Sequence, residues 1–360
     1  MLETVRTACL VLGIGLTTTP AATELAPKID SALARQYFEE AQEVCRKDGG
    51  RLWEHTLCGP LLFATPESLE AVASEADLEG KLREEEGVWV GRLDPDVRPA
   101  NTDLEWAGKR WTQLLWPLPE DPVERRALLM HESWHRIQEE LGFPRPTAVA
   151  EHLDTYDGRL WLILEWRSLQ AALEAAEPAR QQAAHDALLF RRARFARLSE
   201  EARSREVALE TFEGLAEYTG RRLCGLPEEQ LPAMLIGHIA KGLALPSFVR
   251  TFPYYSGPAW GLLLDLEGVR WRQGLEPGTD LAELWAEAVG RERPDPSELE
   301  ARAAQRAPTY GLGELARRER AREEKRVARL DRQRRLLVHE PHLRLPLVGG
   351  RFNISFDPRR

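Results

Sequence analysis

The stretch "ALLMHESWHRIQEELGF", residues 127–143, holds the most informative pattern in the chain. His131 and His135 are four positions apart, and Glu132 directly follows the first of them. On a helix, the Cβ atoms of residues i and i+4 lie about 6 Å apart, so two such imidazoles could share one ion. The interpretation of the motif therefore depends on whether this segment is helical.

The sequence on both sides of the motif predicts a helix. Asp121 is a good N-cap, and Pro122 suits the first helical position. Gly142 follows the last periodic apolar residue and is typical of a helix end. The apolar residues recur at helical spacing as Val123, Ala127, Met130, Trp134, Ile137 and Leu141. His131 and His135 lie beside this stripe, so they should flank the buried face.

The H-E-x-x-H spacing is typical of zinc hydrolases, in which the glutamate acts as general base. Zinc prefers four tetrahedral nitrogen, oxygen or sulfur ligands and, for catalysis, keeps one position open. His131 and His135 supply two ligands, so a third must come from elsewhere in the chain. The alternative is a solvated helix face on which the spacing is accidental.

Composition narrows the class of protein. The chain has 360 residues, of which 43% are hydrophobic and 30% charged, which is ample for a sizeable core. Its formal net charge of −9 argues against a nucleic-acid role. Residues 317–335 are locally basic, with ten basic and four acidic side chains, and are expected to form a solvated helix.

Residues 1–22 have the layout of a secretory signal peptide. Arg6 precedes an apolar run over residues 8–16, and small residues follow up to Ala22. The run is too short to span a membrane, and no other stretch is apolar enough. We therefore expect a periplasmic or secreted mature chain without an integral membrane span.

The cysteines fit an exported protein. Cys45 and Cys58 enclose twelve residues and could form a disulfide in an oxidising compartment. Cys9 would leave with the signal peptide, and Cys224 would remain free and buried. No C-x-x-C pair is present, so a cysteine-based zinc site is not expected.

The remaining chain predicts an α+β fold. Residues 23–120 should form an N-terminal helix and sheet part, with the helix over residues 30–47. Residues 52–117 contain short segments rich in Trp, Val and Leu, separated by Gly, Pro and Asp, which predict a small, mainly antiparallel sheet of four or five strands. The expected strands are "LWEHTLCG", "PLLFAT", "LEAVAS", "GVWVGRL" and "KRWTQLLWPL".

Residues 121–340 should form a largely helical, zincin-like part that carries the H-E-x-x-H helix. Beyond that helix, the pattern predicts helices over residues 158–176, 178–203, 206–223, 228–242, 257–266, 280–290 and 296–337. Residues 341–360 return to strand character.

A second segment bears on the third ligand. Residues 210–220 read "ETFEGLAEYTG", and Glu213, Gly214 and Ala216 match a Glu-Gly-x-Ala pattern. This resembles the third-ligand segment of the gluzincin metallopeptidases, above all of their aminopeptidase-like members. The resemblance implies that Glu213 is the third zinc ligand.

A third segment, "PYYSGPAWG" at residues 253–261, is similar to the Tyr-x-x-Gly segment of the same enzymes. There a tyrosine hydroxyl stabilises the oxyanion. The resemblance implies that role for Tyr254, with Tyr255 as the alternative.

The chain departs from those aminopeptidases in its spacing, because 77 residues separate His135 from Glu213. The identity of the third ligand stays open, and Glu165, Glu210 and Glu217 also compete for it. Glu165 lies on an almost continuously apolar helix. It could instead pair with Arg167 or another arginine, or orient a ligand histidine.

These observations together predict an exported zinc-dependent metallopeptidase-like hydrolase that acts on a peptide or protein substrate. Zn²⁺ would be held by His131, His135 and Glu213, while Glu132 and Tyr254 would be catalytic. The alternatives are a metal-binding protein of the same architecture without peptidase activity, and a helical interaction protein with an accidental H-E-x-x-H.

Overall fold

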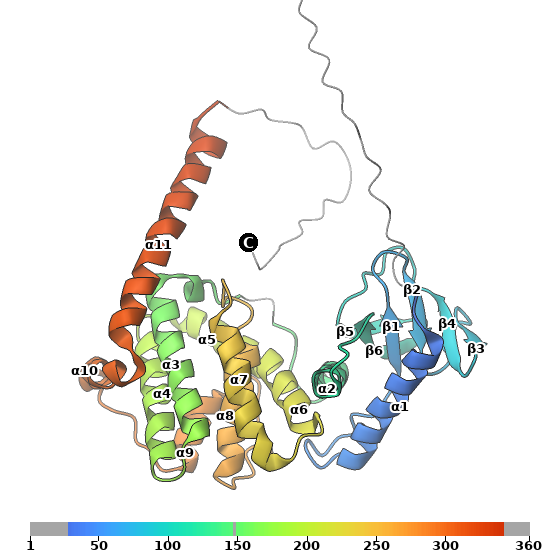
Figure 1. The fold of residues 1–360 in the computed structure, drawn as a ribbon, viewed down its shortest axis with the longest axis horizontal. Coiled ribbons are helices and arrows are strands. Elements are labelled where there is room, and N and C mark those ends of the chain that lie inside the picture. The colour runs from blue at the N-terminus through green and yellow to red at the C-terminus, as the bar shows by residue number, and fades with distance from the viewer. Residues whose placement is uncertain (1–27, 147–148, 342–360) are drawn as a thin grey trace, which may run out of the picture.

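The computed structural model describes residues 28–146 and 149–341 and has an α+β fold. A sheet part, with α1 (Ser31–Asp48) and six strands, lies beside a helical part that begins after residue 149. Helix α2 (Pro122–Gln138) lies between the two parts (Figure 1). The expected signal peptide and the expected strand segment after residue 341 fall outside the described residues.

The sheet is mainly antiparallel, as predicted, but has six strands. These are β1 (Leu61–Ala64), β2 (Glu70–Ala73), β3 (Arg83–Glu85), β4 (Val88–Arg92), β5 (Thr102–Trp106) and β6 (Lys109–Leu115), in the order β3-β4-β2-β1-β6-β5. Four of the neighbouring pairs are antiparallel, and β1 runs parallel to β6.

Alternation along the strands separates two apolar layers. In β1, Leu61 and Phe63 face the main core, whereas Leu62 and Ala64 face a smaller cluster on the other side of the sheet. Phe63 stacks on Phe38 of α1 at a centroid distance of 4.4 Å. Helix α1 therefore covers the face of the sheet that joins the main core.

Residues 52–59 were expected to form a strand and do not. Cys58 in this segment is disulfide-bonded to Cys45 near the end of α1, as the sequence suggested. Arg136 of α2 donates hydrogen bonds to the carbonyls of Leu57 and Cys58. Two carbonyl groups of the segment are thus bound by a side chain of α2 and not by a strand partner. Cys224 is free and buried.

The helical part consists of α3 (Tyr156–Glu174), α4 (Ala179–Phe195), α5 (Glu200–Leu209), α6 (Leu215–Leu223), α7 (Leu231–Leu243), α8 (Pro253–Leu266), α9 (Leu281–Ala288), α10 (Pro296–Arg306) and α11 (Leu312–Arg334). Buried tryptophans on four helices, Trp134, Trp166, Trp260 and Trp285, belong to one apolar core that continues from the sheet part. None of the described helices is both long and apolar enough to cross a bilayer.

Three of the expected helices are interrupted. The helix expected over residues 296–337 breaks at Gly311, whose φ of +78° is a left-handed conformation that glycine adopts readily. The one expected over residues 178–203 ends at Phe195, and Ser199 then caps α5. The helix expected over residues 206–223 contains a π-helical turn over Glu210–Gly214, between α5 and α6.

Candidate metal centre

The H-E-x-x-H segment lies on α2, as the sequence predicted. The side chain of Asp121 accepts hydrogen bonds from the backbone N–H groups of Val123 and Glu124, and Pro122 is the first helical residue. Both histidines are buried, with 4% of His131 and 7% of His135 exposed. They belong to the interface between α2 and the helical part and not to a solvated face.

Glu213 meets the two histidines. The Nε2 atoms of His131 and His135 are 3.1 Å apart, and Oε2 of Glu213 lies 3.3 Å from Nε2 of His135 and 3.7 Å from Nε2 of His131. Ligand atoms around a tetrahedral zinc ion are about 3.4 Å apart, since each lies about 2.0–2.1 Å from the metal. The donor set and its spacing therefore fit one metal ion.

A hydrogen-bond partner at each Nδ1 atom orients the two imidazoles so that both Nε2 atoms face Glu213. Nδ1 of His131 lies 2.8 Å from Oε2 of Glu217, an acceptor, so it carries the proton. Nδ1 of His135 lies 2.7 Å from Oε1 of Gln138. A metal-binding histidine commonly makes such a hydrogen bond, which fixes its tautomer and leaves Nε2 free for the metal.

The charges around the site favour a cation. Burial acts to lower the pKa of His131, but the carboxylates of Glu213 and Glu217 outweigh it and raise the pKa to about 10. Burial opposes ionisation of Glu213, yet the two histidines hold its pKa well below the usual value. For Glu217, hydrogen bonding to His131 and the charge of Arg221 overcome burial and lower the pKa to about 2.

Glu132 is buried next to the ligands without a full set of partners. It is 4% exposed, and its Oε1 lies 4.0 Å from Nε2 of His131. Its Oε2 has no hydrogen-bond partner among the described residues. Burial raises its pKa, although both histidines act in the opposite direction. Because this buried oxygen lies beside the donor cluster, Glu132 is a candidate for a functional group.

Glu213 reaches the site from the π-helical turn. Gly214 and Gly257 permit a close approach of this turn to α8, because a Cβ atom at Gly257 would lie 2.4 Å from the Cα of Gly214, and one at Gly214 would lie 3.0 Å from the Cα of Gly257. On α6, a Cβ atom at Gly220 would lie 2.3 Å from the carbonyl oxygen of Ala127 on α2. The close packing at Gly220 brings α6 against α2, which carries the two histidines, and the packing at Gly214 brings the π-helical turn against α8, which carries Tyr254.

Of the two candidate tyrosines, Tyr254 lies at the site. Its hydroxyl donates a 2.9 Å hydrogen bond to Oε2 of Glu213, and its ring is parallel to that of His131 at a centroid distance of 5.6 Å. Tyr255 instead packs against Trp166 and His238. Burial raises the pKa of the Tyr254 hydroxyl far above its usual value, so it stays a hydrogen-bond donor.

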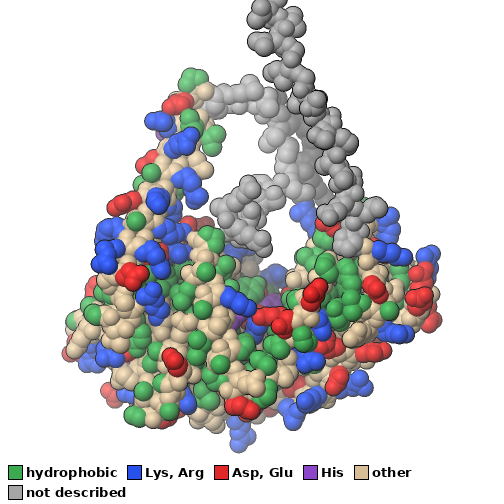
Figure 2. Space-filling model, in the orientation of Figure 1, with side chains coloured by type: hydrophobic (Ala, Val, Ile, Leu, Met, Phe, Trp, Pro, Cys, Tyr) green, Lys and Arg blue, Asp and Glu red, His purple; other side chains and the backbone are tan. Residues whose placement is uncertain are grey.

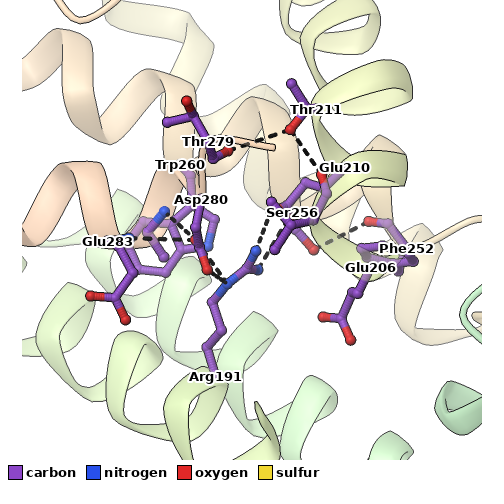
Figure 3. A network of polar contacts seen from close by, with 12 residues as sticks. Arg191, Glu206, Glu210, Thr211, Phe252, Ser256, Trp260, Thr279, Asp280 and Glu283 are labelled. Carbon is purple, nitrogen blue, oxygen red and sulfur yellow. Dashed lines mark hydrogen bonds and ion pairs between the residues drawn. The ribbon is translucent and has the colours of Figure 1, made fainter. Parts of the chain in front are cut away.

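The competing carboxylates have other partners. Glu217 orients His131, whereas Glu210 lies away from the donor cluster in a buried ion pair with Arg191. Arg191 also contacts Asp280, as Figure 3 shows. In a regular α-helix, the i, i+3, i+7 spacing of Glu210, Glu213 and Glu217 would place all three on one face. The π-helical turn between α5 and α6 has more residues per turn than an α-helix, so this spacing is lost. Glu210 lies against Arg191 and not against the two histidines.

Glu165 pairs with arginines, but not with Arg167. It accepts hydrogen bonds from Arg191 at 3.2 Å, from Arg194 at 2.7 Å and from Trp260 at 3.1 Å. Arg167 donates to the carbonyl of Tyr310 instead. Glu165 is fully buried, so two guanidinium partners and an indole offset the cost of its desolvation.

Two side chains at the site were not predicted from the sequence. Gln138 accepts from His135, and His238 lies 3.4 Å from Oε1 of Glu217 and 2.9 Å from the carbonyl of Tyr254. Gln138 lies three residues after His135 on the same helix, and this spacing was the one available signal. His238 has no such signal, because its position depends on how α7 packs against α8.

One side of the site, at Glu213, is more accessible than the side formed by the two histidines. The side chain of Glu213 is 18% exposed, compared with 5% for His131 and 6% for His135. On the face drawn in Figure 2, histidine surface is visible deep in the hollow between the sheet part and the helical part.

Comparisons with models of protein families, with curated proteins and with solved structures find no match for this chain.

Proposed function

We propose that the chain is an exported zinc-dependent hydrolase of metallopeptidase type. One observation carries the proposal. Three donor atoms from His131, His135 and Glu213 lie within 4.8 Å of one another. Oε2 of Glu132, which has no hydrogen-bond partner in the described part of the chain, is buried beside them. An accidental H-E-x-x-H would not be expected to acquire a third ligand and an unpaired carboxylate oxygen at the same point.

Zinc is the metal that this donor set fits best. Two imidazole nitrogens and one carboxylate oxygen are the ligands of many catalytic zinc sites, which keep their fourth position open. Sites for magnesium or calcium are built mainly from oxygen atoms. When bound, zinc would supply Lewis acidity and lower the pKa of water at the open position.

The other residues supply proton transfer and charge stabilisation. Glu132 accepts the proton of the attacking water and passes it to the leaving amine, as a general base and then a general acid. The hydroxyl of Tyr254, which lies 2.9 Å from Oε2 of Glu213, donates a hydrogen bond to the oxyanion of the substrate. Glu217 and Gln138 hold the two histidines in the tautomer that presents Nε2.

The exported location rests on the layout of residues 1–22 and is supported by the disulfide between Cys45 and Cys58. Disulfides persist in oxidising compartments and are rare in the cytosol. N-terminal sequencing of protein from the native host should begin near Ala22 or Thr23. A mature protein that still begins at Met1 would contradict export.

The experiment that tests the function combines metal analysis with turnover. The purified mature protein should contain about one zinc per chain by elemental analysis and should hydrolyse members of a mixed peptide library. His131→Ala serves as the zinc-free control. Zinc without hydrolysis would indicate a metal-binding protein that is not a peptidase. Absence of any bound metal would indicate that the motif is accidental.

A further inference from the structure

Gln138 connects the two segments that carry the proposed ligands. It is buried, with 1% of its surface exposed, and lies on α2 three residues after His135. Its Oε1 lies 2.7 Å from Nδ1 of His135, and its Nε2 donates a 2.8 Å hydrogen bond to the carbonyl of Phe212. Phe212 immediately precedes Glu213 in the chain.

The two hydrogen bonds of Gln138 depend on one another. The carbonyl of Phe212 can only accept, so the amide nitrogen of Gln138 must face it, and the amide oxygen must then face His135. That oxygen can only accept, so Nδ1 of His135 carries the proton and Nε2 presents its lone pair to the metal point. The backbone of the π-helical turn thereby selects the tautomer of His135.

The same turn is held from other directions. Thr211 donates to the carbonyls of Val207 and Thr279, and Arg191 is ion-paired with Glu210 (Figure 3). These contacts hold the first half of the turn, farther from the ligand. The bond from Gln138 is made to the residue next to Glu213, and the ring of Phe212 also stacks on His135 at a centroid distance of 4.8 Å.

We propose that Gln138 is a positioning residue that ties His135 to the π-helical turn, so that two of the three ligands are held as one unit. The proposal rests on the metal centre described above and not on peptide hydrolysis. Its competitor is an ordinary buried hydrogen bond that stabilises the packing of α2 without any effect on the metal.

Gln170 offers a matched control for that competitor. It also lies within a helix, α3, and its Nε2 donates a 3.0 Å hydrogen bond to the carbonyl of Ile236 on α7. Substituting it removes the same kind of contact between two helices without touching the proposed ligands. Gln170→Met loses one such bond and Gln138→Met loses two, so both should lower Tm, and Gln138→Met should lower it by more.

The experiment measures the zinc Kd by competition with a chromophoric chelator and the visible absorption of the Co²⁺-loaded protein, in the full chain. We expect Gln138→Met to weaken zinc binding about 10–100-fold and to change the Co²⁺ spectrum, because a hydrogen-bond partner of a ligand is lost. Gln170→Met should change neither.

Gln138→Glu separates the two bonds, because its carboxylate can accept from His135 but cannot donate to the carbonyl of Phe212. We expect it to stay at least about 10-fold weaker than the parent, since only one of the two bonds is restored. Glutamate is nearly isosteric with glutamine, so Gln138→Glu also tests the proposal if the Gln138→Met protein does not fold.

Parent-like zinc affinity and Co²⁺ spectrum in Gln138→Glu would overturn the proposal, as would equal changes in the Gln138→Met and Gln170→Met proteins. Failure of the parent chain to bind zinc would overturn both this proposal and the proposed function. Normal zinc binding by the parent without hydrolysis of peptides would contradict only the proposed function.

Discussion

Oε2 of Glu217 lies 2.8 Å from Nδ1 of His131, on the side of the imidazole that faces away from Glu213. The two carboxylates on one helical segment therefore have different roles toward the same histidine. Glu213 and Nε2 of His131 would bind the same metal ion. Glu217 instead fixes the tautomer of His131 and accepts a 2.7 Å hydrogen bond from Arg221. This difference can be measured.

Glu213→Ala should give folded protein that loses most of its zinc on dialysis, because a ligand is removed. Glu217→Ala should keep zinc but bind it about 10–100-fold more weakly, since it loses only the hydrogen-bond partner of a ligand. Elemental analysis after dialysis, with His131→Ala as the zinc-free control, distinguishes the two. Full occupancy in Glu213→Ala would exclude it as the third ligand.

Glu132→Gln should retain zinc and lose turnover. The substitution preserves size but removes the base, and proton transfer by a positioned base contributes about 10²–10⁴-fold to the rate. Zinc content and kcat on a library-derived peptide would be measured on the same preparation. Unchanged hydrolysis would remove Glu132 from the mechanism.

Tyr254→Phe should reduce kcat by about 10²–10³-fold, because it removes a donor to the oxyanion. Tyr255→Phe is the matched control, since that ring packs against Trp166 and His238, away from Glu213. Zinc content must be measured in both variants, because the Tyr254 hydroxyl also binds Glu213. Greater damage from Tyr255→Phe would reverse the assignment of the two tyrosines.

Much of the site could be predicted from local sequence. The cap at Asp121 and the spacing of His131 and His135 depend only on neighbouring residues, and the structure has both on one helix. Glu213 was one of four candidates, and sequence alone could not separate them. The decisive contacts involve Arg191, Arg194 and the π-helical turn, all of which depend on how distant helices pack.

The sheet shows the same limit. The strands rich in Val, Leu and Trp were predicted, but β3 reads "REE" and β5 reads "TDLEW", and both lie at the edges where little apolar surface is buried. Residues 52–59 have the composition of a strand, yet they are held by the disulfide and by Arg136. The parallel pairing of β1 with β6 depends on contacts between segments far apart in sequence.

Gly257→Ala should destabilise the protein and weaken zinc binding together. The added Cβ atom would lie 2.4 Å from the Cα of Gly214, so α8 and the π-helical turn would have to separate. Overpacking of this kind costs about 1–3 kcal/mol. Gly237→Ala on α7 is the control, because its Cβ atom meets nothing within 4 Å and should add about 0.5–1 kcal/mol of stability. The two proteins are compared by chemical denaturation and zinc Kd, and equal effects would contradict the close-approach argument.

The buried ion pair of Glu206 and Arg194 should make stability depend on acid. Glu206 is fully buried, its carboxylate lies 2.6 Å from Nη2 of Arg194, and it also contacts His152. Burial opposes its ionisation, but Arg194 and His152 outweigh that effect and lower its pKa to about 2. Because the folded-state pKa lies below the unfolded value, this stabilisation is present above about pH 4.5 and is lost as the pH falls through 2.

Glu206→Gln should therefore lower the free energy of unfolding at pH 7 by more than it does near pH 2. The difference between the two conditions should be on the order of 3 kcal/mol, since one pKa unit corresponds to about 1.4 kcal/mol. Glu201→Gln is the control on the same helix, because Glu201 pairs with Arg205 at the surface and its side chain is 73% exposed. Denaturant titrations of both variants and the parent at several pH values measure the effect. A Glu206→Gln deficit that stays constant from pH 7 to pH 2 would show that the carboxylate is not the group whose protonation weakens the fold, because a neutral glutamine cannot follow the titration that the ionised glutamate undergoes.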